Sequence, residues 1–156
     1  MPERPRSRNG DRLVRRRLLV LLAWTCVVWG HSLVAGPGSQ AESGRVVRLL
    51  EPILQVLGVT GEHAMSFVVR KGGHLSEYAI LAILAMRVGW ALPDGARLRA
   101  LPIAWVVLVS VVDETIQLFV PGRSGQATDV LIDLTGAGVG ALVAWLVGRR
   151  VTRTSR

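Results

Sequence analysis

Four long apolar runs alternate with polar segments along the chain. They cover residues 18–35, 72–92, 101–120 and 130–147, and an α-helix needs about 20 residues to cross a bilayer. The first run is apolar on every side of the helix, whereas a helix of a soluble bundle keeps one polar face. We therefore predict an all-α, polytopic membrane bundle with four transmembrane helices, in a single domain over 18–148.

The segment between the first two runs predicts a loop and one short helix. Residues 36–44 (GPGSQAESG) have the composition of a loop. Apolar residues at helical spacing then follow over 45–57, which is too short to cross a bilayer. We expect a short amphipathic helix in the first outer loop, lying flat at the membrane interface or packed over the bundle like a lid. In the last run, Gly136 and Gly140 predict close helix packing.

The distribution of charge predicts the orientation. The chain carries 19 Lys and Arg against 11 Asp and Glu, a net charge of +8. Most of the basic residues fall in the tails 1–17 and 149–156 and in the segment between the second and third membrane runs. The positive-inside rule then places both termini in the cytoplasm. Membrane topology and anionic lipid account for this charge, so we expect the lipid bilayer as a partner and no nucleic acid.

The first run has a second interpretation. It follows three consecutive arginines and precedes small residues at positions 39 and 41, as the core of a cleaved signal peptide does. Such cores span about 7 to 15 residues. The run at 18–35 is longer, and we interpret it as the first span.

Ionisable residues occur where a membrane span makes them costly. Five carboxylates lie in the outer halves of the runs or at their edges: Glu77, Asp113, Glu114, Asp129 and Asp133. A charge at the centre of a membrane helix costs about 2.5–3.5 kcal/mol, and such residues mark a functional site or a structural ion pair. The helical repeat puts Asp113 on the same face as Gln117 and Asp129 on the same face as Asp133. We expect one polar site at the outer end of three helices.

This site contains candidate residues for acid–base chemistry and for binding. His74, Asp113 and Glu114 are the candidates for proton transfer. The candidates for substrate binding are Arg70, Lys71, Glu77, Tyr78, Gln117, Arg123, Asp129 and Asp133. His74, Asp113, Glu114 and Asp129 could also hold a divalent cation, although no local metal motif such as H-E-x-x-H is present. The pattern names no metal and no cofactor, and we expect His31 and His63 to be isolated polar or packing residues rather than ligands.

These motifs together resemble the VanZ-like family of bacterial membrane proteins. The resemblance is carried by Lys71-x-x-His74-x-x-Glu77-Tyr78, then Asp113-Glu114-x-x-Gln117-x-x-x-Pro121-x-Arg123, then Asp129 followed by glycines. Many members have Asn where this chain has Asp133. The resemblance implies a protein of the bacterial cytoplasmic membrane, in a family whose founding member is linked to low-level resistance to the glycopeptide teicoplanin.

Three functions fit the pattern. The first is a polar acid–base site that binds or modifies an anionic envelope lipid headgroup or a lipid-linked precursor. The second is a proton-coupled transporter or flippase, in which the same carboxylates relay protons. The third is a non-catalytic membrane scaffold whose charge cluster fixes the register of the helices.

Overall fold

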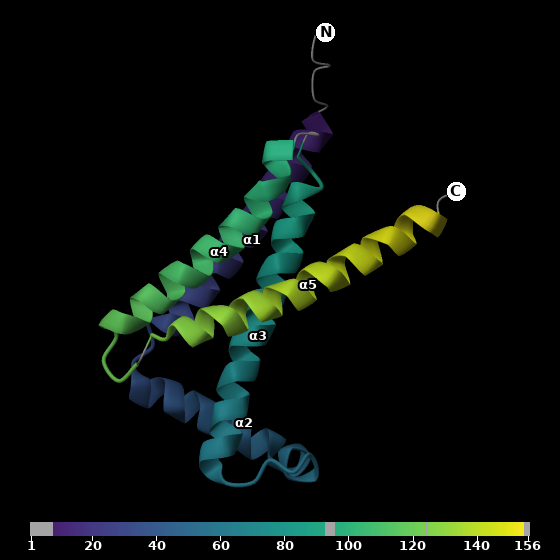
Figure 1. The fold of residues 1–156 in the computed structure, drawn as a ribbon. Helices are drawn as coiled ribbons and strands as arrows, with labels where there is room; N and C mark the ends of the chain where they lie inside the picture. The colour runs from purple at the N-terminus through teal and green to yellow at the C-terminus, as the bar shows by residue number, and fades with distance from the viewer. Residues whose placement is uncertain (1–7, 93–95, 124, 155–156) are drawn as a thin grey trace.

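The computed structural model describes residues 8–92, 96–123 and 125–154 as five α-helices, with no strand in those ranges. The helices are α1 (Arg8–Ser32), α2 (Gly36–Val56), α3 (Glu62–Gly89), α4 (Ala96–Phe119) and α5 (Ala127–Thr154). The all-α prediction is therefore confirmed. In Figure 1, α1 and α4 lie side by side, α5 crosses α3, and α2 lies across one end of the bundle.

The central helix is α3, which contacts each of the other four. Its residues Tyr78 and Leu81 are fully buried, and they join the main apolar core. That core also takes Val28 from α1 and Val109 from α4, both fully buried. The second half of α3 thus lies in this core, whereas the polar residues of its first half are exposed or half-buried.

The closest approach between helices joins α3 to α5. A Cβ atom added at Gly136 would collide with the backbone carbonyl of Leu75, and one added at Gly140 would collide with that of Ala79. Gly138, between them, has open space instead. The predicted close packing at Gly136 and Gly140 is therefore confirmed, and the order of the contacts shows that the two helices run parallel.

A sharp bend separates α1 from α2. The two helix axes differ by 107° across the break. The Gly36 backbone N–H donates to the Pro121 carbonyl at 3.0 Å, which ties the bend to the α4–α5 loop. Gly122 in that loop has φ +74°, a conformation that glycine adopts without strain, and a side chain at Gly36 would collide with its backbone.

The prediction of a loop over 36–44 is wrong. These residues form the first part of α2, which starts at Gly36 rather than near residue 45 and ends at Val56. Proline in the first turn favours the start of a helix. The residues of α2 that face α3 lie at helical spacing: Ser39, Ser43, Val47 and Leu54 are buried. Tertiary packing therefore outweighs the turn-forming composition.

Two helices within the described ranges are long and apolar enough to cross a membrane. They are α4, over Ala100–Phe119, and α5, over Ala127–Gly148, and the bent pair α1 and α2 adds a third candidate if it is counted as one span. Although α3 has 28 residues, the polar residues in its first half lower its hydropathy. Large apolar side chains on the candidate spans are exposed, among them Ile103 and Leu131, as expected of surfaces that face lipid. The length and composition of the described helices thus indicate two or three membrane spans, whereas the sequence predicted four.

Candidate functional site

A buried polar cluster lies where α3, α4 and α5 meet. His74 comes from α3, Asp113 and Glu114 from α4, and Asp133 from α5. One ligand atom from each of the four side chains lies within 4.8 Å of the others. Asp113 is 1%, Glu114 6% and Asp133 0% exposed. The structure therefore brings together all three predicted acid–base residues, and we call these four residues the carboxylate cluster.

Hydrogen bonds hold one oxygen of each carboxylate. Ser110 Oγ donates to Asp133 Oδ2 at 2.8 Å, and the Gln126 backbone N–H donates to Glu114 Oε2 at 2.8 Å. Gln117 Nε2 lies 3.3 Å from Asp113 Oδ2 and 3.4 Å from Glu114 Oε1. The other oxygen of Asp133 lies 3.1 Å from His74 Nδ1. Asp113 Oδ1 is buried and has no hydrogen-bond partner among the residues that the structure describes.

The helical repeat explains how α4 presents these groups. Ser110, Asp113 and Gln117 are spaced three and four residues apart, so they lie on one face, and all three are buried. The same face continues into the apolar core at Val106 and Val109. The helix thus buries an apolar stripe along one part of its length and a polar stripe toward its C-terminal end.

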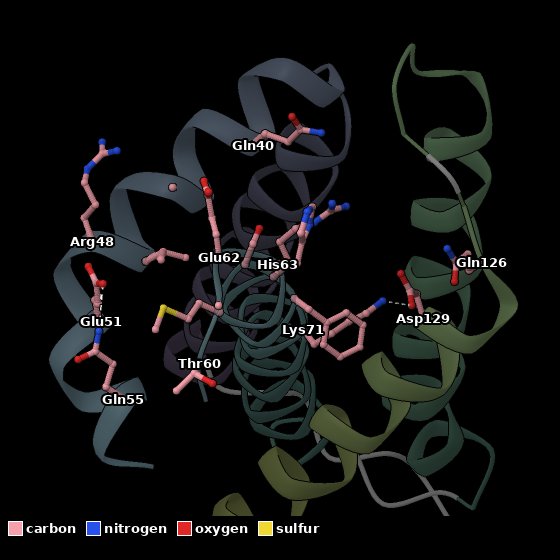
Figure 2. Close-up of a pocket in the computed structure, with 17 residues that line it drawn as sticks. Gln40, Arg48, Glu51, Gln55, Thr60, Glu62, His63, Lys71, Gln126 and Asp129 are labelled. Carbon is pink, nitrogen blue, oxygen red and sulfur yellow. Dashed lines mark hydrogen bonds and ion pairs between the residues drawn. The ribbon is translucent and has the colours of Figure 1, made fainter. Parts of the chain in front are cut away.

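The set of possible metal ligands differs from the predicted one. Asp133 joins the cluster, whereas Asp129 lies one turn earlier on α5 and pairs with Lys71. Figure 2 shows the Lys71 side chain reaching to Asp129, with Gln126 beside it. The parallel packing of α3 and α5 sets this register, because it places Lys71 level with Asp129 and His74 level with Asp133.

Two predicted site residues of α3 lie next to the cluster without joining it. Glu77 Oε1 contacts His31 Nδ1 at 2.6 Å, so His31 is a paired residue and its predicted isolation is wrong. Tyr78 is one helical turn after His74 and fully buried, and its hydroxyl has no hydrogen-bond partner within the described ranges. The substrate-binding role of Tyr78 stays a prediction.

Two cavities flank α3 near α2. One, of about 540 Å³, lies among α1, α2 and α3, and we call it the His74 cavity; its charged and titratable lining residues are His31, Glu42, Arg70, His74, Glu77 and Arg123. The other, of about 870 Å³, is the Lys71 cavity of Figure 2 and includes Lys71, His63 and Asp129. Arg70 lines both cavities. His74 therefore connects an accessible cavity to the buried carboxylates.

Two arginines supply positive charge to the His74 cavity. Arg123 donates from Nε to the Val34 carbonyl at 3.1 Å and from Nη2 to the His31 carbonyl at 2.5 Å. Burial lowers the pKa of the Arg123 guanidinium, and the like charge of Arg70 lowers it further. Arg70 has no carboxylate partner among the described residues. The cavity thus holds two arginines of like charge, and the carboxylates of Glu77, Asp113 and Glu114 offset part of that charge.

Sequence reasoning missed four contributors to this site. Ser110 and Ser32 supply hydroxyl groups, His31 pairs with Glu77, and Gln126 contributes its backbone N–H. Ser110 could have been found, because it lies three residues before Asp113 on the same helical face. Ser32 and His31 lie on α1 and Gln126 lies in the α4–α5 loop, so no spacing along the helices of the cluster indicates them.

We expect Arg123→Lys to destabilise the fold by about 1–3 kcal/mol, because an ammonium cannot reproduce the two diverging N–H donors of Arg123. The carbonyls at the end of α1 would lose a charged donor at the bend into α2. Thermal unfolding in detergent checks this result. Arg48→Lys, an exposed arginine on α2, is the matched control. Equal melting temperatures for the two variants would contradict the role of Arg123.

Comparison with known proteins identifies the family. Residues 17–148 match the sequence model of the VanZ/LLP1 family. That match includes α2 to α4 and the parts of α1 and α5 that carry the site. Neither the curated proteins nor the solved structures include a match to this chain. Since the matched region covers most of the chain, this membrane protein belongs to the VanZ/LLP1 family.

Proposed function

We propose that α1, α3, α4 and α5 each cross the bacterial cytoplasmic membrane and that both termini are cytoplasmic. The four helices have 25, 28, 24 and 28 residues, and a span needs about 20. The polar half of α3 is compatible with a span because Lys71 and His74 pair with Asp129 and Asp133 of α5, which lowers the cost of placing charge in a membrane. In this arrangement α2 lies across the outer end of the bundle, and the His74 cavity faces the cell envelope.

We further propose that the His74 cavity binds the anionic headgroup of an envelope lipid or lipid-linked precursor and that the site modifies it by acid–base chemistry. The observation that carries this proposal is the presence of Arg70 and Arg123 beside His74 in one cavity. Two neighbouring cations are unfavourable until an anion binds between them, and a guanidinium matches phosphate or carboxylate well.

The hydrogen bonds of His74 support a role in proton transfer. Its Nδ1 lies 3.1 Å from Asp133, which is fully buried and also accepts a hydrogen bond from Ser110. A buried carboxylate that orients a histidine toward a cavity is a recurrent arrangement of general acids and bases. In this proposal Asp113 and Glu114 set the charge around the ring of His74 and take part in proton transfer.

The test is mass spectrometry of envelope lipids and cell-wall precursors from a deletion strain. The strain is complemented with wild type, Arg70→Gln, His74→Gln or His63→Gln at matched protein levels. His63 is the control because it is an exposed histidine on the same helix that does not line the His74 cavity. We expect one anionic species to change in the deletion strain and to be restored by wild type and by His63→Gln.

Loss of His74 should abolish that restoration, since general acid–base catalysis contributes about 10²–10⁴-fold to a rate. Loss of Arg70 should weaken it through binding. Full restoration by His74→Gln, or identical profiles in all strains, would refute the proposal and favour a structural cluster. Teicoplanin susceptibility, measured in the same strains, tests the link to glycopeptide tolerance.

A further inference from the structure

The carboxylate cluster carries more negative charge than its surroundings compensate. It holds three buried carboxylates and a single titratable base, His74. The nearby cations are engaged elsewhere: Lys71 pairs with Asp129, and Arg123 donates to carbonyls at the end of α1. Among the ion pairs of the described residues, His74 is the only basic side chain that pairs with the cluster, while Arg123 acts on Asp113 and Glu114 by its charge alone.

The hydrogen-bond donors around the cluster do not reach every carboxylate oxygen. Ser110, Gln117 and the Gln126 backbone each hold one oxygen of a different carboxylate. Of the three remaining oxygens, Asp133 Oδ1 lies 3.1 Å from His74 Nδ1, Glu114 Oε1 has only the Gln117 amide at 3.4 Å, and Asp113 Oδ1 has no partner in the described ranges. Asp113 is 1% exposed, so water does not reach this oxygen freely. An unpaired oxygen on a buried side chain that belongs to a ligand set is an independent indication of a bound group.

We propose that His74, Asp113, Glu114 and Asp133 together bind one divalent first-row metal ion. One imidazole and three carboxylates suit Zn²⁺ or Mn²⁺, whereas Mg²⁺ and Ca²⁺ prefer oxygen ligands alone. Ligand atoms around a tetrahedral zinc ion lie about 3.4 Å apart, given metal–ligand distances of about 2.1 Å. The four ligand atoms lie within 4.8 Å of one another, so they must approach by up to about 1.4 Å to complete the site.

The donors around the cluster have the arrangement that metal sites use. Ligating carboxylates are themselves hydrogen-bonded through their second oxygen, and this fixes their orientation. Here each carboxylate already has one oxygen held by a neutral donor of the protein. The ion would lie next to the His74 cavity and would add its charge to that of Arg70 and Arg123. Metal binding does not depend on the proposed function, because it is measured without a substrate.

The experiment measures the metal content of the full chain, purified in mild detergent with a tag that contains no histidine. Elemental mass spectrometry follows incubation with Zn²⁺, Mn²⁺, Mg²⁺ or Ca²⁺ and removal of free ion. We expect about one Zn²⁺ or Mn²⁺ per chain for wild type and for Asp11→Asn, an exposed carboxylate far from the cluster. Asp113→Asn should bind less than about one-tenth of that amount, and Ser110→Ala should weaken affinity about 10–100-fold.

Asp113→Asn keeps a carbonyl that accepts from Gln117, so it should fold, and its melting temperature shows whether it does. A chelator should lower the melting temperature of wild type and leave that of Asp113→Asn unchanged. Absence of stoichiometric Zn²⁺ or Mn²⁺ in wild type would overturn the proposal, as would equal binding by Asp113→Asn. Binding of Mg²⁺ or Ca²⁺ alone would overturn the assigned class of metal. If wild-type protein binds the metal as expected but the lipid profiles of the strains do not differ, only the proposed function is refuted.

Discussion

Replacing Gly140 with alanine is expected to destabilise the protein by about 2–3 kcal/mol, because the new methyl group collides with the backbone of Ala79. A backbone carbonyl cannot rotate away as a flexible side chain does. The two helices must therefore separate, and the contacts between α3 and α5 would loosen along their length. Thermal and denaturant unfolding in detergent measure the effect.

Gly138→Ala is the matched control for this change. It lies on the same helix, two residues away, and its added methyl group meets nothing within 4 Å. Both substitutions gain about 1 kcal/mol of helix propensity, so their difference isolates the collision. We expect Gly138→Ala to be neutral or stabilising. If both variants unfold at the same temperature, α3 and α5 do not approach one another as closely as described.

Asp113→Asn and Asp129→Asn, which make the same chemical change, should have opposite effects on stability. In the presence of a chelator, Asp113→Asn removes one of three clustered carboxylates and should stabilise the protein by about 1–3 kcal/mol. Asp129→Asn removes the partner of Lys71, and it should destabilise the protein by about 1–3 kcal/mol. Both side chains are largely buried, so solvent screens neither effect fully.

Melting temperatures of both variants, measured side by side with wild type at neutral pH with chelator, decide this prediction. A stabilised Asp113→Asn that has lost metal would show that the carboxylate serves function at a cost in stability. Destabilisation by both substitutions would mean instead that Asp113 has a cationic or protonated partner that the cluster geometry does not reveal.

Spacing along single helices predicted much of the site. The interval of four residues correctly placed Asp113 and Gln117 on one buried face, and the spacing of Gly136 and Gly140 predicted their close packing. These predictions succeed because the helical repeat depends only on local geometry. The VanZ-like resemblance, based on the same residues, is likewise confirmed by the family match.

Pairing between helices was not predictable in the same way. The sequence offered Asp129 as a metal ligand, yet the structure pairs it with Lys71 and places Asp133 beside His74. That choice depends on the register of α3 against α5, which the contacts of Gly136 with Leu75 and of Gly140 with Ala79 fix. The prediction of a loop over residues 36–44 failed for a related reason, since the contact of α2 with α3 outweighs their turn-like composition.

The central position of α3 has a consequence for how the protein is made. Asp133 is synthesised 59 residues after His74, and Asp129 follows Lys71 by 58 residues. At a synthesis rate of about 5–20 residues per second, several seconds pass between the synthesis of α3 and that of α5, whose carboxylates pair with it. During that interval Lys71 and His74 lack the acidic partners that they have in the folded protein. Assembly of the site is therefore a late step of folding, because it must await the synthesis of α5.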